Sequence, residues 1–226
     1  MFFGLCNAPA TFQVFVNHIF KDLINEELIL LYLDDLMIFS EDDAQHESTS
    51  KCVFKILWEN RLYLKLKKCE FNVESVTFLG HVLGNRELNV DPKKSSAVAT
   101  WPALSDKKEL RQFLSMGNWL RRFIPGYSRI VRLLTKLTGN NLWNWRLEEQ
   151  HAFEEIRAKL SNPPTLALPT DDNPFRVKVD ASGFATGGVL LQEQEGRWQP
   201  IVYLSQAMTD TEWNYEIYNK EMMAII

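Results

Sequence analysis

Cysteine is scarce in this sequence, with only Cys6, Cys52 and Cys69 among 226 residues. The number is odd and the spacing fits no zinc motif, so neither a disulfide framework nor a zinc site is expected. Long hydrophobic runs are also lacking, because no apolar stretch approaches the roughly 20 residues that span a bilayer. The first five residues carry neither the basic flank nor the cleavage site of a signal peptide. These absences predict a reduced intracellular, cytoplasmic compartment and no membrane partner.

Internal repeats and low-complexity tracts are absent as well, and the composition is that of an ordinary globular protein. At 226 residues the chain is too long for one small core and suits two or three compact modules. The net charge of −4 argues weakly against a nucleic-acid partner, but the charges are unevenly distributed. Residues 105–136 hold eight cations against two acids, whereas nine acids face four bases from residue 171 onward. A basic middle suits contact with phosphates, and an acidic end suits metal ions.

Two adjacent carboxylates, Asp34 and Asp35, lie between two short apolar runs within residues 28–40. Each run has the length of a buried strand, so the pattern predicts a β-hairpin with both acids at its turn. Two ionised carboxylates side by side repel each other, and a divalent cation bound between them removes that repulsion. Asp is also a common turn former, and an Asp-Asp turn taken alone is more often simply a turn.

The segment after Pro9 carries apolar residues at helical spacing as far as Leu23, which predicts a helix facing a core. Gln13 falls off this stripe, so it is either solvated or facing a substrate cleft. A second helix, capped by Asp42 or Asp43, is expected to run to about residue 60.

Residues 62–71 are expected to form a loop and a strand, and residues 76–83 a second strand that pairs with it. Gly80 then marks a bulge or a close backbone approach. His81 is expected to be an ordinary edge residue, since no other histidine or cysteine lies at ligand spacing. Helix starts are expected at Asp91-Pro92 and at Asp106, with Glu109 as its capping partner. The remaining elements are expected as helices at 128–138, 147–160 and 212–226, linkers at 162–164 and 169–174, and strands at 175–180, 187–192 and 201–204.

Five short motifs follow one another in a fixed order. They are Phe-Gly-Leu-Cys-Asn-Ala-Pro-Ala-Thr-Phe-Gln at 3–13, Tyr-Leu-Asp-Asp at 32–35, Phe-Leu-Gly-His at 78–81, Asp-Ala-Ser at 180–182 and Lys-Glu-Met-Met-Ala-Ile at 220–225. Each motif alone has weak to moderate specificity. In this order they closely resemble the pol polyprotein of gypsy-class LTR retrotransposons, and the resemblance covers essentially the whole chain.

The resemblance implies an α+β fold with four parts. These are a partial reverse transcriptase palm at 1–88, a helical thumb at 89–139, a connecting segment at 140–170, and the N-terminal part of an RNase H-like α/β domain at 171–226. The implied activities are RNA-directed DNA synthesis and cleavage of the RNA strand of a hybrid, both by two-metal chemistry. The implied partners are an RNA/DNA template-primer duplex, dNTPs and the remainder of the pol polyprotein, within a cytoplasmic virus-like particle.

By the same resemblance, Asp34 is a direct ligand of Mg²⁺ (or Mn²⁺), and Asp35 is a ligand or a nearby supporting charge. Asp180 and Glu221 correspond to the first two acids of the RNase H metal site. The nucleotide-binding candidates are Phe3, Gly4, Gln13 and Tyr32. The primer and template candidates are Phe78, Leu79 and Gly80 at the primer end, Lys67 or Lys68 on a phosphate, and Arg121 and Arg122 in the thumb.

Departures from the family pattern are expected to weaken both sites. One further aspartate would precede Met1, two further acids would follow Ile226, and Phe2 stands where the family usually has proline. A site with missing ligands is expected to bind Mg²⁺ poorly, because Mg²⁺ tolerates little deviation in geometry. The competing hypothesis is therefore an inactive retroelement remnant that acts at most as a nonspecific RNA–DNA duplex-binding module. A third hypothesis is an adopted protein-interaction scaffold.

Overall fold

The computed structural model describes residues 4–40, 42–140 and 142–225, so Phe2, Phe3 and Ile226 lie outside the described part. The contacts divide the chain into two compact units, with the boundary between Val73 and Glu74. Among the described residues, no helix combines the length and apolarity needed to cross a membrane. The division into four parts that the resemblance implies stays a prediction.

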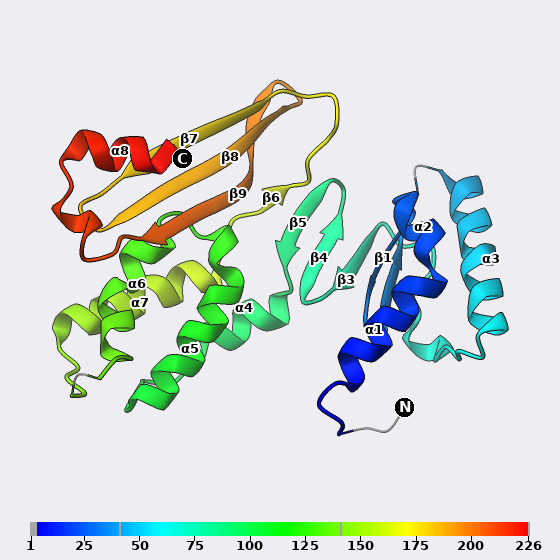
Figure 1. Cartoon of the computed structure of the whole chain (residues 1–226), viewed down its shortest axis with the longest axis horizontal. Coiled ribbons are helices and arrows are strands. Elements are labelled where there is room, and N and C mark those ends of the chain that lie inside the picture. The colour runs from blue at the N-terminus through cyan, green and yellow to red at the C-terminus, as the bar shows by residue number, and fades with distance from the viewer. Residues whose placement is uncertain (1–3, 41, 141, 226) are drawn as a thin grey trace. The chain divides into compact units, whose positions relative to one another are not determined.

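The first unit is built on the predicted hairpin (Figure 1). Strands β1 (Ile29–Tyr32) and β2 (Asp35–Ile38) pair antiparallel. Helix α1 (Ala8–Ile19) packs against β1 and α3 (Asp43–Glu59) against β2, while the short helix α2 (Lys21–Asn25) follows α1. The buried core is small and consists of Val16, Phe20, Leu23, Ile29, Val53 and Leu57.

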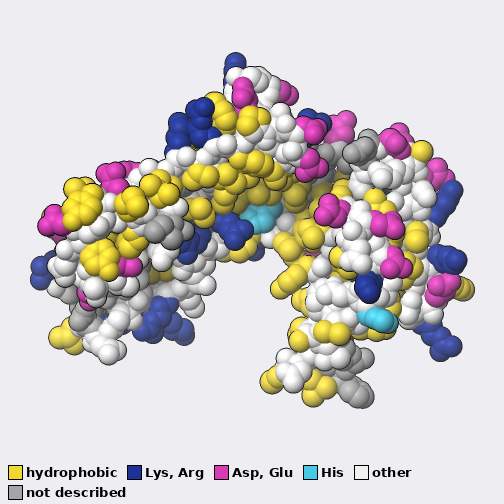
Figure 2. Space-filling model, turned by 45° about the horizontal axis from the view of Figure 1, so that its top comes forward, with side chains coloured by type: hydrophobic (Ala, Val, Ile, Leu, Met, Phe, Trp, Pro, Cys, Tyr) yellow, Lys and Arg dark blue, Asp and Glu magenta, His cyan; other side chains and the backbone are white. Residues whose placement is uncertain are grey.

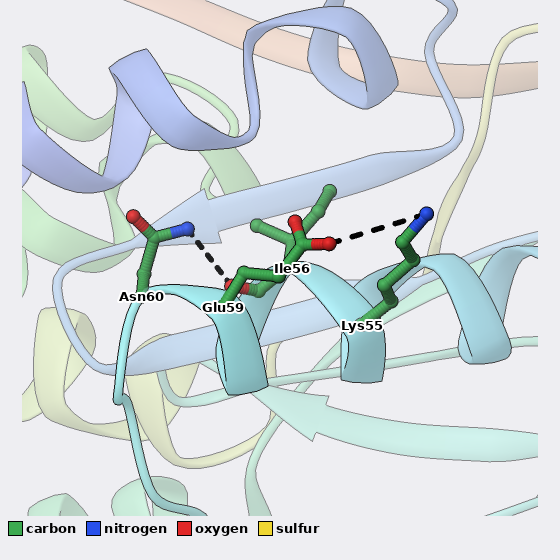
Figure 3. Close-up of polar contacts among 4 residues, drawn as sticks. All are labelled: Lys55, Ile56, Glu59 and Asn60. Carbon is green, nitrogen blue, oxygen red and sulfur yellow. Dashed lines mark hydrogen bonds and ion pairs between the residues drawn. The ribbon is translucent and has the colours of Figure 1, made fainter.

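Helix α3 begins and ends at local polar contacts. The Asp42 side chain accepts a hydrogen bond from the Gln45 backbone amide at 2.7 Å, so Asp42 rather than Asp43 is the cap. At the other end, Asn60 Nδ2 donates to the Ile56 carbonyl at 2.9 Å (Figure 3). Beside it, Lys55 Nζ lies 4.0 Å from Glu59 Oε1, and both side chains are exposed to solvent. This ion pair therefore contributes little to stability.

The strand predicted within residues 62–71 is wrong, because that segment holds only a short 3-10 helix, η1 (Leu66–Lys68). The single strand predicted at 76–83 is two strands, β3 (Ser75–Phe78) and β4 (His81–Gly84), which pair with each other. Leu79 and Gly80 turn the chain between them with φ of 50° and 81°. The apolar run thus conceals a tight turn, since left-handed φ is open to glycine but uncommon for leucine.

Strands β5 (Glu87–Val90) and β6 (Leu166–Ala167), which the sequence pattern does not predict, complete this sheet in the order β3-β4-β5-β6. The helices α4 (Pro92–Ala99), α5 (Lys107–Leu120), α6 (Tyr127–Leu137) and α7 (Leu147–Ser161) follow, with the 3-10 helix η2 (Arg121–Phe123) after α5. Asp106 caps α5 by accepting from the Glu109 amide at 2.8 Å. These helices share the main core of the second unit, in which Phe113 and Phe153 are almost fully buried.

A second sheet ends the chain, with the order β7-β8-β9 and all strands antiparallel. Its strands are β7 (Phe175–Ala181), β8 (Ala185–Gln194) and β9 (Arg197–Ala207). The predicted helix at 212–226 begins later than expected, as α8 (Ile217–Ile225) after a 3-10 turn, η3 (Glu212–Asn214), and α8 packs against β7 and β8. The α+β class is confirmed, as are a three-stranded sheet and one helix in this part.

Candidate functional site

The acidic pair of the first unit lies where the hairpin reverses. Leu33 and Asp34 form the two-residue turn, and Asp35 opens β2 opposite Tyr32. Both carboxylates are exposed, and neither forms an ion pair with another described residue. Two unneutralised carboxylates are therefore held next to each other on a strand-turn-strand frame.

Gln13 fixes this turn from helix α1. Its side-chain oxygen accepts a hydrogen bond from the Leu33 amide at 2.6 Å, and its Nε2 donates to Asn17 Oδ1 at 2.8 Å. Leu33 has a φ of 53°, a left-handed conformation that costs a leucine energy and needs support from its surroundings. The contact of Gln13 with the turn backbone indicates that it positions the acids, whereas the predicted contact with a nucleotide stays a prediction.

Replacing Gln13 by leucine is expected to lower the free energy of unfolding by about 1–3 kcal/mol, because the half-buried Leu33 amide loses its acceptor. Gln13→Glu keeps that acceptor and is expected to cost less, although it adds a third negative charge near Asp34. Urea denaturation of the two variants at neutral pH measures the difference. Equal losses in both variants would contradict a role for the Gln13 oxygen in the turn.

The type and the number of the ligands that Asp34 and Asp35 offer suit Mg²⁺. Mg²⁺ prefers hard oxygen ligands, keeps several waters, and is commonly held by one or two carboxylates together with substrate phosphates. Asp34 and Asp35 supply two such carboxylates. Within residues 4–40, 42–140 and 142–225, however, no three His, Cys, Asp or Glu side chains group closely enough to enclose a metal ion. The pair alone thus suits a weak site completed by water and a ligand.

The predicted primer element, Phe78 to Gly80, forms the β3–β4 turn in the second unit. A Cβ atom on Gly80 would lie 2.9 Å from the Trp119 ring, so only glycine allows this approach. His81 stacks on Trp119 at 4.6 Å and on Phe123 at 5.5 Å between ring centroids. This stacking, which locks the turn onto α5 and η2, is invisible in the sequence because its partners are distant along the chain.

The pKa of His81 lies below its ordinary value of 6.5, because burial penalises the charged ring. Its Nδ1 atom is buried and has no hydrogen-bond partner among the residues that the structure describes. Above the ordinary pKa the ring is neutral in both states. As the pH falls below it, the unfolded chain takes up the proton first, so the free energy of unfolding is expected to decrease. Urea denaturation at pH 7.5 and at pH values below 6.5 should show a smaller decrease for His81→Phe than for the wild type.

Five of the eight cations in residues 105–136 are engaged within the second unit. Lys107 Nζ and Arg111 Nη2 donate to the Gly139 and Thr138 carbonyls, at 2.6 and 2.7 Å, beyond the end of α6. Arg121 donates to the Ser205 carbonyl on β9. The other two lie over aromatic rings, Arg132 over Phe184 and Lys136 over Trp213.

The side chains of Lys108, Arg122 and Arg129 make no hydrogen bond, ion pair or ring contact with any other described residue. Figure 2 shows the Lys and Arg side chains visible from one side in dark blue, and they do not form one continuous patch. The local charge of +6 in the sequence therefore overstates the free positive surface. Lys67 and Lys68 are both exposed in η1, so the choice between them stays open.

Asp180 lies on β7 and lines a hollow of about 380 Å³ between the β7–β9 sheet and helices α6 and α7. In the strand register Asp180 lies opposite Gly187, which pairs in turn with Ser205. Ser205 Oγ accepts from the Ser128 amide at 2.9 Å, which fixes the sheet to the start of α6. Glu221 is exposed on α8 and does not line the hollow.

Two family models match the chain. Residues 1–83 match the reverse transcriptase (RNA-dependent DNA polymerase) family, and residues 145–226 match the RNase H-like domain found in reverse transcriptase. Among curated proteins, the chain is 37% identical to the retrovirus-related Pol polyprotein from transposon 297 of Drosophila melanogaster, covering 99% of the chain and 21% of that protein. It is 33% identical to the transposon Tf2-3 polyprotein of Schizosaccharomyces pombe, covering 99% of the chain and 17% of that protein.

Solved structures of reverse transcriptases also match the chain. A foamy viral protease-reverse transcriptase in complex with dsDNA matches with a TM-score of 0.84 at 27% identity, over 100% of this chain and 47% of that one. The same kind of protein in complex with an RNA/DNA hybrid matches with a TM-score of 0.81 at 26% identity, over 100% of this chain and 30% of that one. The chain spans about a fifth of the length of the curated relatives it matches. It therefore belongs to the pol polyproteins of gypsy-type LTR retrotransposons and carries reverse transcriptase sequence followed by an RNase H-like domain.

Proposed function

We propose that the chain contributes to RNA-directed DNA synthesis and to removal of the RNA strand from the resulting hybrid. The observation that carries this proposal is the exposed Asp34–Asp35 pair on a turn that Gln13 holds through the Leu33 amide. The complexes of related foamy viral enzymes with dsDNA and with an RNA/DNA hybrid support a template-primer duplex as the partner.

Asp34 and Asp35 would hold Mg²⁺ (or Mn²⁺). When bound, the metal would stabilise the charge that develops on a primer hydroxyl and on the triphosphate of an incoming dNTP. The exposed Tyr32, opposite Asp35 in the hairpin, and Gly4 would border that nucleotide. Asp180 and Glu221 would supply carboxylates to the second centre, which cleaves RNA.

Contacts with the duplex backbone would come from cations that the fold leaves unengaged, among them Lys108 and Arg122 on α5 and η2. Such contacts position a duplex without reading its sequence. Arg121 is a weaker candidate than its neighbour Arg122, because its guanidinium already donates to the Ser205 carbonyl. The β3–β4 turn at Leu79 and Gly80 would contact the primer end, on a rigid base provided by Trp119.

A second candidate is a nonspecific RNA–DNA duplex-binding module without catalysis. The observation that favours it is the absence, in the described part of the chain, of any acidic group large enough to enclose a metal ion. Both candidates require duplex binding, and only the first requires nucleotide addition.

Fluorescence anisotropy with a labelled RNA–DNA hybrid tests the shared requirement. The affinity is expected to fall steeply between about 50 and 200 mM salt, since neutralised phosphates release counterions. Undetectable or salt-independent binding would overturn both candidates. Primer extension with Mg²⁺ then separates them, because incorporation above a no-metal control requires the enzyme and its absence favours the binding module.

A further inference from the structure

The hollow beside Asp180 is lined by three basic residues, each from a different helix or strand. Arg129 projects from the first turn of α6, Lys159 from the last turn of α7, and Lys178 from β7. These residues are far apart in the sequence, and the fold of the second unit brings them to one concavity. The sequence count of cations in residues 105–136 includes only Arg129.

The three cations are not neutralised by the protein. None of their side chains forms a hydrogen bond, ion pair or ring contact with another described residue. Asp180 is the only carboxylate in the lining, and it too has no ion-pair partner among the residues described. The lining therefore holds three positive charges and one negative charge in a concave surface, where like charges repel and a bound anion lowers their energy.

Glycine backbone of β8 forms part of the lining of the hollow. Gly187 and Gly188 of β8 line it, and a Cβ atom on Gly187 would meet no heavy atom closer than 3.9 Å. The hydroxyl-bearing residue Thr186 also lines the hollow, whereas the Ser182 hydroxyl already donates to the Ala185 carbonyl at 2.8 Å. Glycines leave room for a bulky group to approach the sheet, and side-chain hydroxyls can donate to an anionic oxygen.

We propose that this hollow seats a backbone phosphate of a nucleic-acid strand, held by Arg129, Lys159 and Lys178. Its volume of about 380 Å³ admits a phosphate with its sugar. The inference rests on the proposed function for the identity of the anion, since free phosphate shares the same chemistry. It also fixes the register of a strand relative to Asp180, which lies in the same concavity.

The test compares two double variants of the full chain with equal loss of charge. Arg129→Gln with Lys178→Gln removes two of the three cations that line the hollow. Arg86→Gln with Lys93→Gln removes two exposed cations of the same unit that do not line it. The hollow variant is expected to bind the RNA–DNA hybrid about 10- to 100-fold more weakly, as for lost hydrogen bonds to a charged group. Its salt dependence is expected to decrease by about one phosphate contact, whereas the control keeps the wild-type slope.

A steric variant separates shape from charge. Gly187→Val fills the hollow with no change in charge and is expected to weaken hybrid binding to a similar extent, with thermal unfolding checking that the fold is kept. If the hollow variant and the control bind the hybrid with equal affinity while the wild type binds strongly, the hollow is not a phosphate site, and the proposed function stands. If the wild type binds no hybrid, both fail. Binding of inorganic phosphate alone at the hollow, without hybrid binding, would overturn a nucleic-acid occupant.

Discussion

Replacing Phe153 by alanine is expected to lower the free energy of unfolding of the second unit by about 3–5 kcal/mol. The side chain is 1% exposed, and its ring meets Phe113 edge-on at 4.8 Å between centroids. Trp145 contacts the same ring at 6.0 Å, and the Arg157 guanidinium lies over it at 5.1 Å. Truncation therefore opens a cavity where α7 meets α5, and the close-packed surroundings can relax only in part.

Urea denaturation followed by tryptophan fluorescence measures this loss. A matched control is Phe54→Ala, since Phe54 lies on α3 of the first unit with 41% of its surface exposed. That variant is expected to cost less than about 1.5 kcal/mol, because the Phe54 ring is already partly in water and its truncation removes less buried apolar area. Equal losses at both positions would show that the Phe113–Phe153 contact does not hold the helices together.

The parts of the fold that sequence predicts well are those governed by near neighbours. The hairpin around Asp34 follows from two apolar runs with an acidic turn. The structure contains this hairpin, with the turn at Leu33 and Asp34 and with Asp35 as the first residue of β2. The helix starts at Asp42, Asp91 and Asp106 follow from capping, in which a carboxylate accepts from an amide two or three residues ahead. Such signals are contained in a few adjacent residues.

The parts that sequence misses depend on residues far apart in the chain. The turn at Leu79 and Gly80 lies inside an apolar run that resembles one strand, and Trp119 of α5 packs against it. The pairing of β5 with β6 is equally non-local. A strand of two residues such as Leu166–Ala167 has no periodicity that could reveal it.

The candidate site shows the same division. Asp34 and Asp35 are close together because they are neighbours in the sequence. The support that Gln13 gives to their turn depends on its hydrogen bond with the Leu33 amide, which joins residues 20 positions apart and is not predictable from the sequence. The number of cations in residues 105–136 predicts a positive net charge for the helical region. It does not predict that five of these cations contact carbonyl oxygens or aromatic rings of the same unit. A charge count gives the number of cations in a segment, whereas binding of a nucleic acid depends on which of them the fold leaves without a partner.

Asp34→Asn is expected to reduce nucleotide addition by about 10²- to 10³-fold in a pol polyprotein that contains this chain, with hybrid affinity unchanged. Asparagine keeps the size and the turn preference of aspartate, so the hairpin is expected to persist. What is lost is one of two charges that would stabilise a divalent cation, and that loss acts on the rate of addition. Primer extension at saturating template-primer and increasing Mg²⁺ measures it.

The matched control is Asp22→Asn, which removes an exposed carboxylate from α2 in the same unit and is expected to leave the rate unchanged. A partial recovery of Asp34→Asn at high metal concentration is expected if the residue acts by holding the ion, because weaker binding can be offset by mass action. Wild-type rates in both Asp34→Asn and Asp35→Asn would mean that the acids only form a turn. The duplex-binding module would then be the better account of the chain, since it needs the fold and its unengaged cations but no metal.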